Sequence, residues 1–146
     1  RLLFVTQPLK QDLRLSGVPE IKVRLAANKA AANFTAYLVV LPLTEGKRLP
    51  EYENFVTRGW ADPQNHSDIG RQSALVPGQF VDLRFSMIPD DQVIPAGRQI
   101  GLLLFSSDKE FTLHPKPGTV LTLEPAGCEL VLPVVGGSAA WKAAFE

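Results

Sequence analysis

The chain has 146 residues, of which 45% are hydrophobic and 21% are charged, a balance typical of one globular domain rather than a disordered chain. Acidic and basic side chains number 15 each, so no net charge would attract nucleic acid or an anionic membrane surface. The longest apolar run, Tyr37–Leu43, is too short to span a bilayer, and a single cysteine, Cys128, excludes an internal disulfide.

The predicted elements begin with the first residues. A strand pattern opens directly after Arg1 without a Met or a signal-peptide pattern, so we expect the chain to be part of a longer protein. The clearest alternation lies in Glu20–Ala26, where Ile21, Val23 and Leu25 alternate with charged side chains. Turns rich in Gly, Pro, Asn and Asp separate the strand patterns. The predicted strands are Leu2–Thr6, Asp12–Ser16, Glu20–Ala26, Phe34–Leu41, Asn54–Gly59, Phe80–Ile88, Gln99–Ser106, Val120–Leu123 and Glu129–Val134.

Two stretches have helical composition. We expect a loop at Ala26–Ala32, because an alanine-rich stretch of about two turns is marginal as an isolated helix. The tail Ser138–Glu146 is either a short docking helix or a frayed end, with Ser138 as a candidate N-cap and Trp141 and Phe145 one helical turn apart. The regular spacing of short strands predicts an all-β fold, a jelly-roll β-sandwich of about eight to nine strands. We expect the sandwich over 1–137 and the tail over 138–146.

Two predicted strands are apolar on both faces. Along Phe34–Leu41 and along Ile100–Phe105, side chains of both parities are largely hydrophobic. A strand that lacks a polar face needs cover on both sides. One of the two faces is expected to supply the sandwich core, so the other becomes a candidate interface. The side chains of this second face are Tyr37, Val39, Leu41, Leu103 and Phe105.

The segment RGWADPQNH (58–66) holds the densest group of specific side chains. Arg58 offers a planar fork for a carboxylate or for backbone carbonyls, and Trp60 offers a large amphipathic surface. Asp62 precedes a proline and predicts a turn. Two interpretations stay open. In the first, the segment is an interface or ligand platform formed by Arg58, Trp60, Asp62 and His66. In the second, it is a packed corner held by Arg58 and Asp62.

Neither a catalytic centre nor a metal site nor a cofactor motif is predicted. The G-x-S-x-G elbow of α/β-hydrolases is absent, and the histidines, His66 and His114, lie beside turn signals. Cys128 opens an apolar run and is expected to act as a small buried hydrophobe. Trp60 with Tyr52 is a weak candidate for a sugar-stacking platform. Oxygen-rich loops can bind calcium, but the calcium-loop spacing is missing. The aspartates considered for calcium are Asp62, Asp68, Asp90 and Asp91.

Three segments together resemble a known family. They are SGVPEIKVRLAANKAAANFTAYLVVL (16–41), TRGWADPQNH (57–66) and LVPGQFVDLRFSMIPDDQVIPAGRQIGLLLFSSD (75–108). In combination they resemble the C-terminal non-catalytic domain of X-prolyl dipeptidyl-peptidases, a family that also takes in the cocaine-esterase-like acyl hydrolases. The ending FTLHPKPGTVLTLEPAGCELVLPVVGG (111–137) fits the same pattern, so the resemblance covers Leu2 to Gly137.

The resemblance implies a galactose-binding-like jelly roll that follows an α/β-hydrolase domain carrying a Ser-Asp-His triad. None of those catalytic positions falls within this sequence. The implied partners are that catalytic domain and a peptide substrate that loses an N-terminal Xaa-Pro dipeptide; no nucleic-acid, membrane or cofactor partner is implied. On this interpretation the second apolar face lies against the hydrolase domain, and the sandwich walls part of the substrate entrance. Two alternatives stay open: the same domain of an ester-cleaving acyl hydrolase, and a free-standing carbohydrate-binding module.

Overall fold

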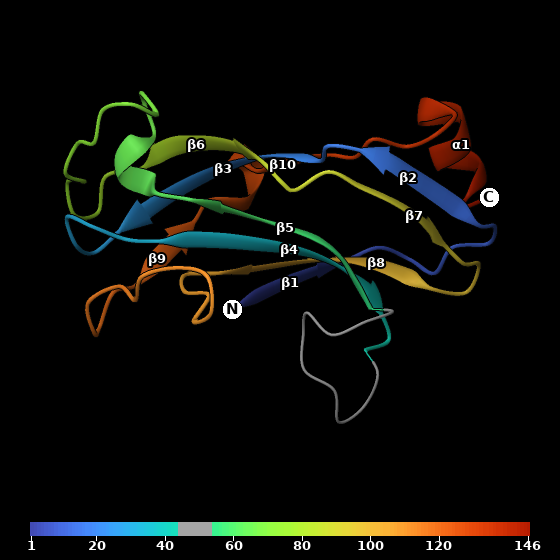
Figure 1. Cartoon of the computed structure of the whole chain (residues 1–146), viewed down its shortest axis with the longest axis horizontal. Helices are drawn as coiled ribbons and strands as arrows, with labels where there is room; N and C mark the ends of the chain where they lie inside the picture. Colours follow the sequence, from blue (N-terminus) through green and yellow to red (C-terminus); the bar gives the residue numbers. More distant parts are fainter. Residues whose placement is uncertain (44–53) are drawn as a thin grey trace.

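The computed structural model describes residues 1–43 and 54–146, whose strands lie in two stacked layers (Figure 1). The strands are β1 (Leu2–Val5), β2 (Leu13–Gly17), β3 (Glu20–Ala27), β4 (Phe34–Leu41), β5 (Phe55–Ala61), β6 (Val81–Ser86), β7 (Asp90–Ile94), β8 (Gln99–Phe105), β9 (Leu121–Leu123) and β10 (Glu129–Val131). The helical elements are the 3-10 turns η1 (Pro63–Asn65) and η2 (Pro125–Gly127) and the helix α1 (Gly137–Ala143).

The first layer is an antiparallel sheet with the strand order β1-β8-β4-β5. Its two central strands, β4 and β8, are the strands whose sequences are apolar on both faces. A central strand is paired along both edges, and β-branched and aromatic side chains pack well on its faces. The sequence pattern thus identifies the middle of this sheet, and β1 and β5 form its edges.

The second layer is built around β3, which pairs with β6 on one side and with β10 and β9 on the other. β10 covers Glu20–Lys22 and β9 covers Leu25–Ala27, and between them η2 passes over Arg24. Gly127 permits this passage, because a Cβ there would lie 2.7 Å from the Cβ of Arg24. β2 and β7 form a separate two-stranded sheet, which lies alongside in Figure 1.

The core lies between the two layers. The alternation predicted for β3 is confirmed, because Ile21, Val23 and Leu25 are all buried in the core. From the other layer, Phe34 of β4 meets Phe85 of β6 edge to face, with 6.0 Å between the ring centroids. Full burial of a large apolar side chain contributes about 1.5–3 kcal/mol, so these contacts hold the layers together.

The all-β sandwich predicted from the sequence is confirmed, with one strand that was not predicted and several strand ends that differ. Strand β7 was not predicted, because Asp90 and Asp91 lie between prolines and look like part of a turn. Pairing with β2 overrides that local preference, and an Arg14–Asp91 ion pair of 2.6 Å supports it. The predicted strand that begins at Phe80 ends at Ser86 instead of Ile88.

The C-terminal tail forms a docked helix rather than a frayed end. Trp141 and Phe145 pack against the core with 4.9 Å between their ring centroids, and Ala144 is buried. The cap residue is Gly136, in a left-handed conformation, and not Ser138 as the sequence suggested. Within the described residues, no helix has the length and hydrophobicity needed to cross a membrane.

Candidate functional site

The first sheet has an outer face, which points away from the core. Its composition follows from the strand register, since directly paired residues of antiparallel strands project to the same side. Tyr37 of β4 pairs with Arg58 of β5 and with Leu103 of β8, and Leu103 pairs in turn with Leu3 of β1. The outer face comprises Leu3, Val5, Tyr37, Val39, Leu41, Phe55, Arg58, Trp60, Leu103 and Phe105.

The five apolar side chains predicted for this face differ in exposure. Tyr37 and Val39 are only 5% and 1% exposed, whereas Leu41, Leu103 and Phe105 are half-buried. The ring of Tyr37 packs edge to face against Phe105, with 5.0 Å between the centroids. The expectation of an external cover is therefore corrected for Tyr37 and Val39, which the chain buries by itself. Only the part toward β1 and β8 remains open.

Gly101 of β8 leaves space on the outer face that side chains of the neighbouring strands fill. A Cβ at this position would lie 2.9 Å from Cγ2 of Val39 and 3.2 Å from Cδ1 of Leu41, both on β4. From the other side, Cδ1 of Leu3 on β1 would lie at 3.3 Å. Side chains of two neighbouring strands thus meet above the glycine, and this contact explains the deep burial of Val39.

Strand β1 leaves the outer face incomplete. Leu3 and Val5 lie on this face and are 48% and 45% exposed. Their neighbours Leu2 and Phe4 point to the other face and are also exposed, because β1 is an edge strand. No role was predicted for β1 from the sequence. The signal was present in the run Leu2–Val5, which is apolar at both parities.

The segment 58–66 divides into two parts. Arg58 and Trp60 lie on β5 and belong to the outer face. Asp62 and His66 instead cap the two ends of η1: the Asp62 carboxylate accepts a backbone N–H at 2.8 Å, and the His66 backbone N–H closes the turn. The structure thus assigns Asp62 and His66 to a turn, and the interface interpretation stays a prediction for Arg58 and Trp60.

Asp108 follows β8 and connects this corner to the sheet. Its buried Oδ2 accepts hydrogen bonds from the Tyr37 hydroxyl at 2.6 Å and from the Trp60 indole N–H at 3.0 Å. The pKa of Tyr37 is raised to about 12, mainly by burial and next by the hydrogen bond to Asp108. Arg58 has a smaller effect and lowers this pKa. Asp108 was not predicted as a site residue, although it ends the Ser-Ser-Asp motif of the resemblance.

Aromatic rings surround the guanidinium of Arg58. Its central carbon lies 3.7 Å from the ring centroid of Phe111, 5.1 Å from that of Trp60 and 5.6 Å from that of Phe55. Such cation–π contacts are attractive, but they do not satisfy N–H donors. Nε and Nη1 of Arg58 are buried and have no hydrogen-bond acceptor among the described residues. No strand pattern marked Phe111, although it begins the ending (111–137) that fits the resemblance.

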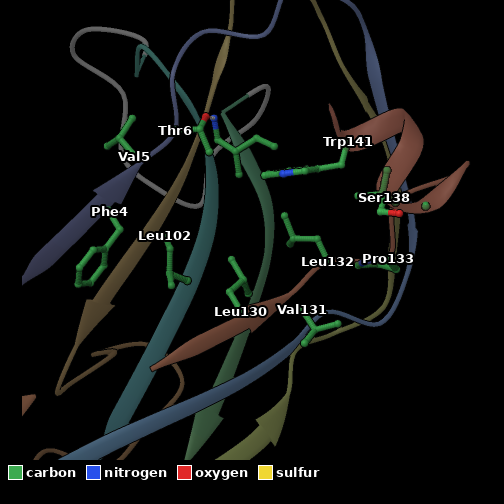
Figure 2. Close-up of a pocket in the computed structure, with 13 residues that line it drawn as sticks. Phe4, Val5, Thr6, Leu102, Leu130, Val131, Leu132, Pro133, Ser138 and Trp141 are labelled. Atoms are coloured by element: carbon green, nitrogen blue, oxygen red, sulfur yellow. Dashed lines mark hydrogen bonds between the residues drawn. The ribbon is translucent and has the colours of Figure 1, made fainter. Parts of the chain in front are cut away.

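An apolar groove of about 690 Å³ opens between β1, β8 and the C-terminal segment. Figure 2 shows Phe4 and Leu102 on one side of it, Leu130 and Leu132 of the C-terminal segment on another, and Trp141 of α1 at its end. Its polar side chains are a threonine and a serine, with no acid or base beside them in the lining. The groove therefore presents a mainly apolar surface.

The described residues bring no candidate metal-binding set together. No group of three or more His, Cys, Asp and Glu side chains forms within 1–43 and 54–146, so the aspartates considered for calcium do not make a site there. Cys128 is half-buried against the core, and its thiol donates to the Glu124 carbonyl at 3.4 Å. Tyr52, considered for a sugar platform, lies outside the described residues.

Comparison with known families places this sandwich among described domains. Residues 1–140 match the family described as the X-Pro dipeptidyl-peptidase C-terminal non-catalytic domain. The chain belongs to this family. The match extends past Gly137 into α1, so most of this helix is part of the family domain.

Two curated relatives show the share of a longer protein that this domain represents. One, from Rhodopirellula baltica, is 51% identical over 138 residues, which cover 94% of this chain and 22% of the relative. The other, from Bacillus cereus, is 40% identical over 135 residues, with 92% and 22% covered. Both are named "Putative Xaa-Pro dipeptidyl-peptidase". The chain thus spans about a fifth of the length of these relatives.

A solved structure shares the fold at lower identity. An alpha-amino acid ester hydrolase superposes with a TM-score of 0.72 at 18% identity, over 92% of this chain and 25% of that enzyme. At this identity the likeness shows a common architecture. Here too the sandwich corresponds to a minor part of a larger hydrolase.

Proposed function

We propose that this X-Pro dipeptidyl-peptidase C-terminal domain docks by its outer face on an α/β-hydrolase catalytic domain that releases Xaa-Pro dipeptides from peptide N-termini. The observation that carries the proposal is a strip of partly exposed apolar side chains, which we call the β1–β8 strip. It consists of Leu3, Val5, Leu103 and Phe105.

The strip has the properties of an unfinished domain interface. Its members are adjacent, since Leu3 and Leu103 are register partners and Val5 pairs with Gly101, next to them on β8. Contiguous exposed apolar patches are uncommon on monomers and usually mark a binding surface. Covering such a patch contributes about 25 cal/mol per Å² of apolar area removed from water. A second domain is a suitable cover, because the strip lies on a sheet face with a rigid backbone.

The chemistry of the parent protein would belong to the catalytic domain. The names of the relatives support cleavage after Xaa-Pro, and the relatives carry most of their length outside the matched region. The role of this domain is then positional: it buttresses the catalytic domain and walls part of the substrate entrance. The Arg58 corner, at the β5 end of the outer face, would border the contact.

A second candidate is the same docking role in an ester-cleaving hydrolase. The observation that favours it is the superposition on the alpha-amino acid ester hydrolase, over 92% of this chain. The docking surface is the same in both cases, and only the substrate of the catalytic domain differs.

A full-length chimera tests the proposal. This chain replaces the matching 138-residue region of the Rhodopirellula baltica relative, and hydrolysis of Xaa-Pro and α-amino ester chromogenic substrates is measured. We expect the chimera to retain Xaa-Pro hydrolysis, because this domain would dock on the relative's catalytic domain as the replaced region does. The double variant Leu3→Glu, Val5→Glu is expected to reduce activity at least about tenfold and to expose the junction to proteases, because buried apolar positions do not tolerate unpaired charge.

The matched control is Val93→Glu, at a β7 side chain that is 51% exposed and lies away from the strip. It should leave the chimera unchanged. Equal behaviour of the two variants in an active chimera would contradict docking through the β1–β8 strip. The full-length parent of this chain, assayed on the same two substrates, separates the two candidates, and preference for the ester substrate there would select the second.

A further inference from the structure

Two of the three nitrogens of the half-buried Arg58 guanidinium lack a hydrogen-bond acceptor among the described residues. Nε and Nη1 are buried without an acceptor, and no ion pair joins Arg58 to an acidic side chain in the described part of the chain. Asp108 is the carboxylate of this corner, but its Oδ2 already accepts from Tyr37 and Trp60. The fold therefore directs this acid to the two aromatic side chains and leaves Nε and Nη1 of Arg58 without an acceptor among the described residues.

This arrangement is unfavourable for a domain that stands alone. A buried donor without an acceptor loses its hydration and gains no hydrogen bond in return, and the loss is larger for a charged group. Cation–π contacts with Phe111 and Trp60 offset part of the cost. They leave the planar N–H donors unused, and those donors match the oxygens of a carboxylate.

The surroundings of Arg58 indicate what kind of partner brings the acceptor. Arg, Trp and Tyr are the residues most enriched among the energetically dominant positions of protein interfaces. Arg58 and Trp60 share the outer face with the apolar β1–β8 strip, so a macromolecule that covers the strip also reaches the corner. Phe111, which stacks on the guanidinium, is 49% exposed and borders the approach.

We propose that Arg58 is the charged anchor of the docked state, and that an aspartate or glutamate of the catalytic domain accepts hydrogen bonds from its guanidinium. This inference rests on the proposed function and specifies its chemistry at one residue. Tyr37 and Trp60, fixed by Asp108, hold the walls of the corner. The complementarity is one of charge: the domain presents a cation within an apolar face, and the partner supplies the anion.

Two measurements on matched variants test the anchor. Arg58→Met removes the charge and keeps a long side chain that still contacts Phe111. Arg58→Lys keeps the charge but loses the planar fork. The control is Arg84→Met, at an exposed arginine of β6 on the other layer. Each is made both in the chimera and in the 146-residue chain alone.

In the chimera, the rate of proteolytic separation at the junction reports the undocked population when opening is fast relative to cleavage. We expect Arg58→Met to raise this rate at least about tenfold, and Arg58→Lys to raise it less. In the chain alone, Arg58→Met should leave the unfolding midpoint unchanged or raise it, because the donors that lack acceptors are gone. Arg84→Met should change neither measurement.

Three results would overturn the anchor, and they are distinguishable. If Arg58→Met lowers the stability of the chain alone as strongly as that of the chimera, Arg58 acts within the domain. If only the strip variant Leu3→Glu, Val5→Glu separates the chimera, docking stands without the anchor. If neither variant has an effect in an active chimera, the docking proposal itself is wrong.

Discussion

Tyr37 and Arg58 are register partners on neighbouring strands, yet their polar groups have opposite environments. The Tyr37 hydroxyl donates to Asp108, and burial keeps it neutral over a wide pH range. Arg58 lies beside it with two buried nitrogens that lack acceptors among the described residues. Asp108 thus orients Tyr37 and Trp60, and under our proposal the two unsatisfied nitrogens of Arg58 bind a carboxylate of the catalytic domain.

The Tyr37–Asp108 hydrogen bond predicts a measurable change in titration. In a Tyr52→Phe background Tyr37 is the sole tyrosine, so tyrosinate absorbance reports it alone. We expect its pKa near the value of about 12 caused first by burial and then by Asp108. Asp108→Asn should lower this pKa but leave it above the ordinary value of about 10, because burial remains.

The raised pKa of Tyr37 also makes stability depend on alkaline pH. Since the folded pKa is the higher one, the unfolded chain releases the Tyr37 proton first, between about pH 10 and pH 12. The contribution of Tyr37 is therefore fully present below about pH 10 and is lost as pH rises toward 12. Tyr37→Phe should remove this loss in denaturant melts at several alkaline pH values. Identical pH profiles for the two proteins would contradict the raised pKa.

Among the secondary-structure elements, those with a strong local pattern were predictable. β3 has strict alternation, and the apolar residues of β4 and β8 indicated a sheet with two covered faces. β7 was not predictable in the same way, because its first residues, Asp90 and Asp91, favour a turn locally. Its conformation is decided by pairing with β2. The two strands lie far apart in sequence, since the paired residues Arg14 and Asp91 are 77 positions apart. Local propensity does not contain that information.

The candidate site was predictable to the same extent. Arg58 and Trp60 belong to a recognisable segment, and alternation along β5 places them on one face. Asp108 and Phe111 also belong to the corner, but they lie in the segment that follows β8. Asp108 is 48 residues after Trp60 in the sequence. No periodicity operates in such a connection, so the position of Asp108 and Phe111 follows only from the tertiary structure.

Close packing over Gly101 predicts a specific sensitivity of β8. Gly101→Ala should destabilise the chain by about 1–3 kcal/mol in denaturant unfolding, because the new methyl group would overlap the side chains of Val39, Leu41 and Leu3. Gly70→Ala is the matched control, since the nearest atom to its added Cβ is 3.5 Å away, on Asp68. A loss at Gly101 no larger than that at Gly70 would mean that the outer face is packed more loosely than described.

In the whole molecule, most apolar side chains of the sandwich are wholly or partly buried, but those of one edge strand are exposed. The core is closed between the layers, and the centre of the outer face is covered by the chain's own aromatic side chains. β1 is the exception, because the β1–β8 strip lies on one of its faces and the apolar groove, lined by Phe4 and also by Val5 of the strip, opens beside it (Figure 2). Both exposed surfaces converge on a single edge strand.

An open edge of this composition predicts self-association of the chain in isolation. Exposed edge strands are usually protected from pairing by a lysine, a proline or a bulge. Leu2–Val5 contains no lysine and no proline. We expect the weight-average mass in sedimentation experiments to rise with concentration. Leu3→Lys should suppress this rise, because it places a charge on the strip, and Val93→Lys should not. The chimera should remain at one mass over the same range, since the catalytic domain then covers the strip. A chain that stays monomeric at every concentration, or that responds equally to the two lysine variants, would show that β1 is not an adhesive edge and would weaken the case for docking through it.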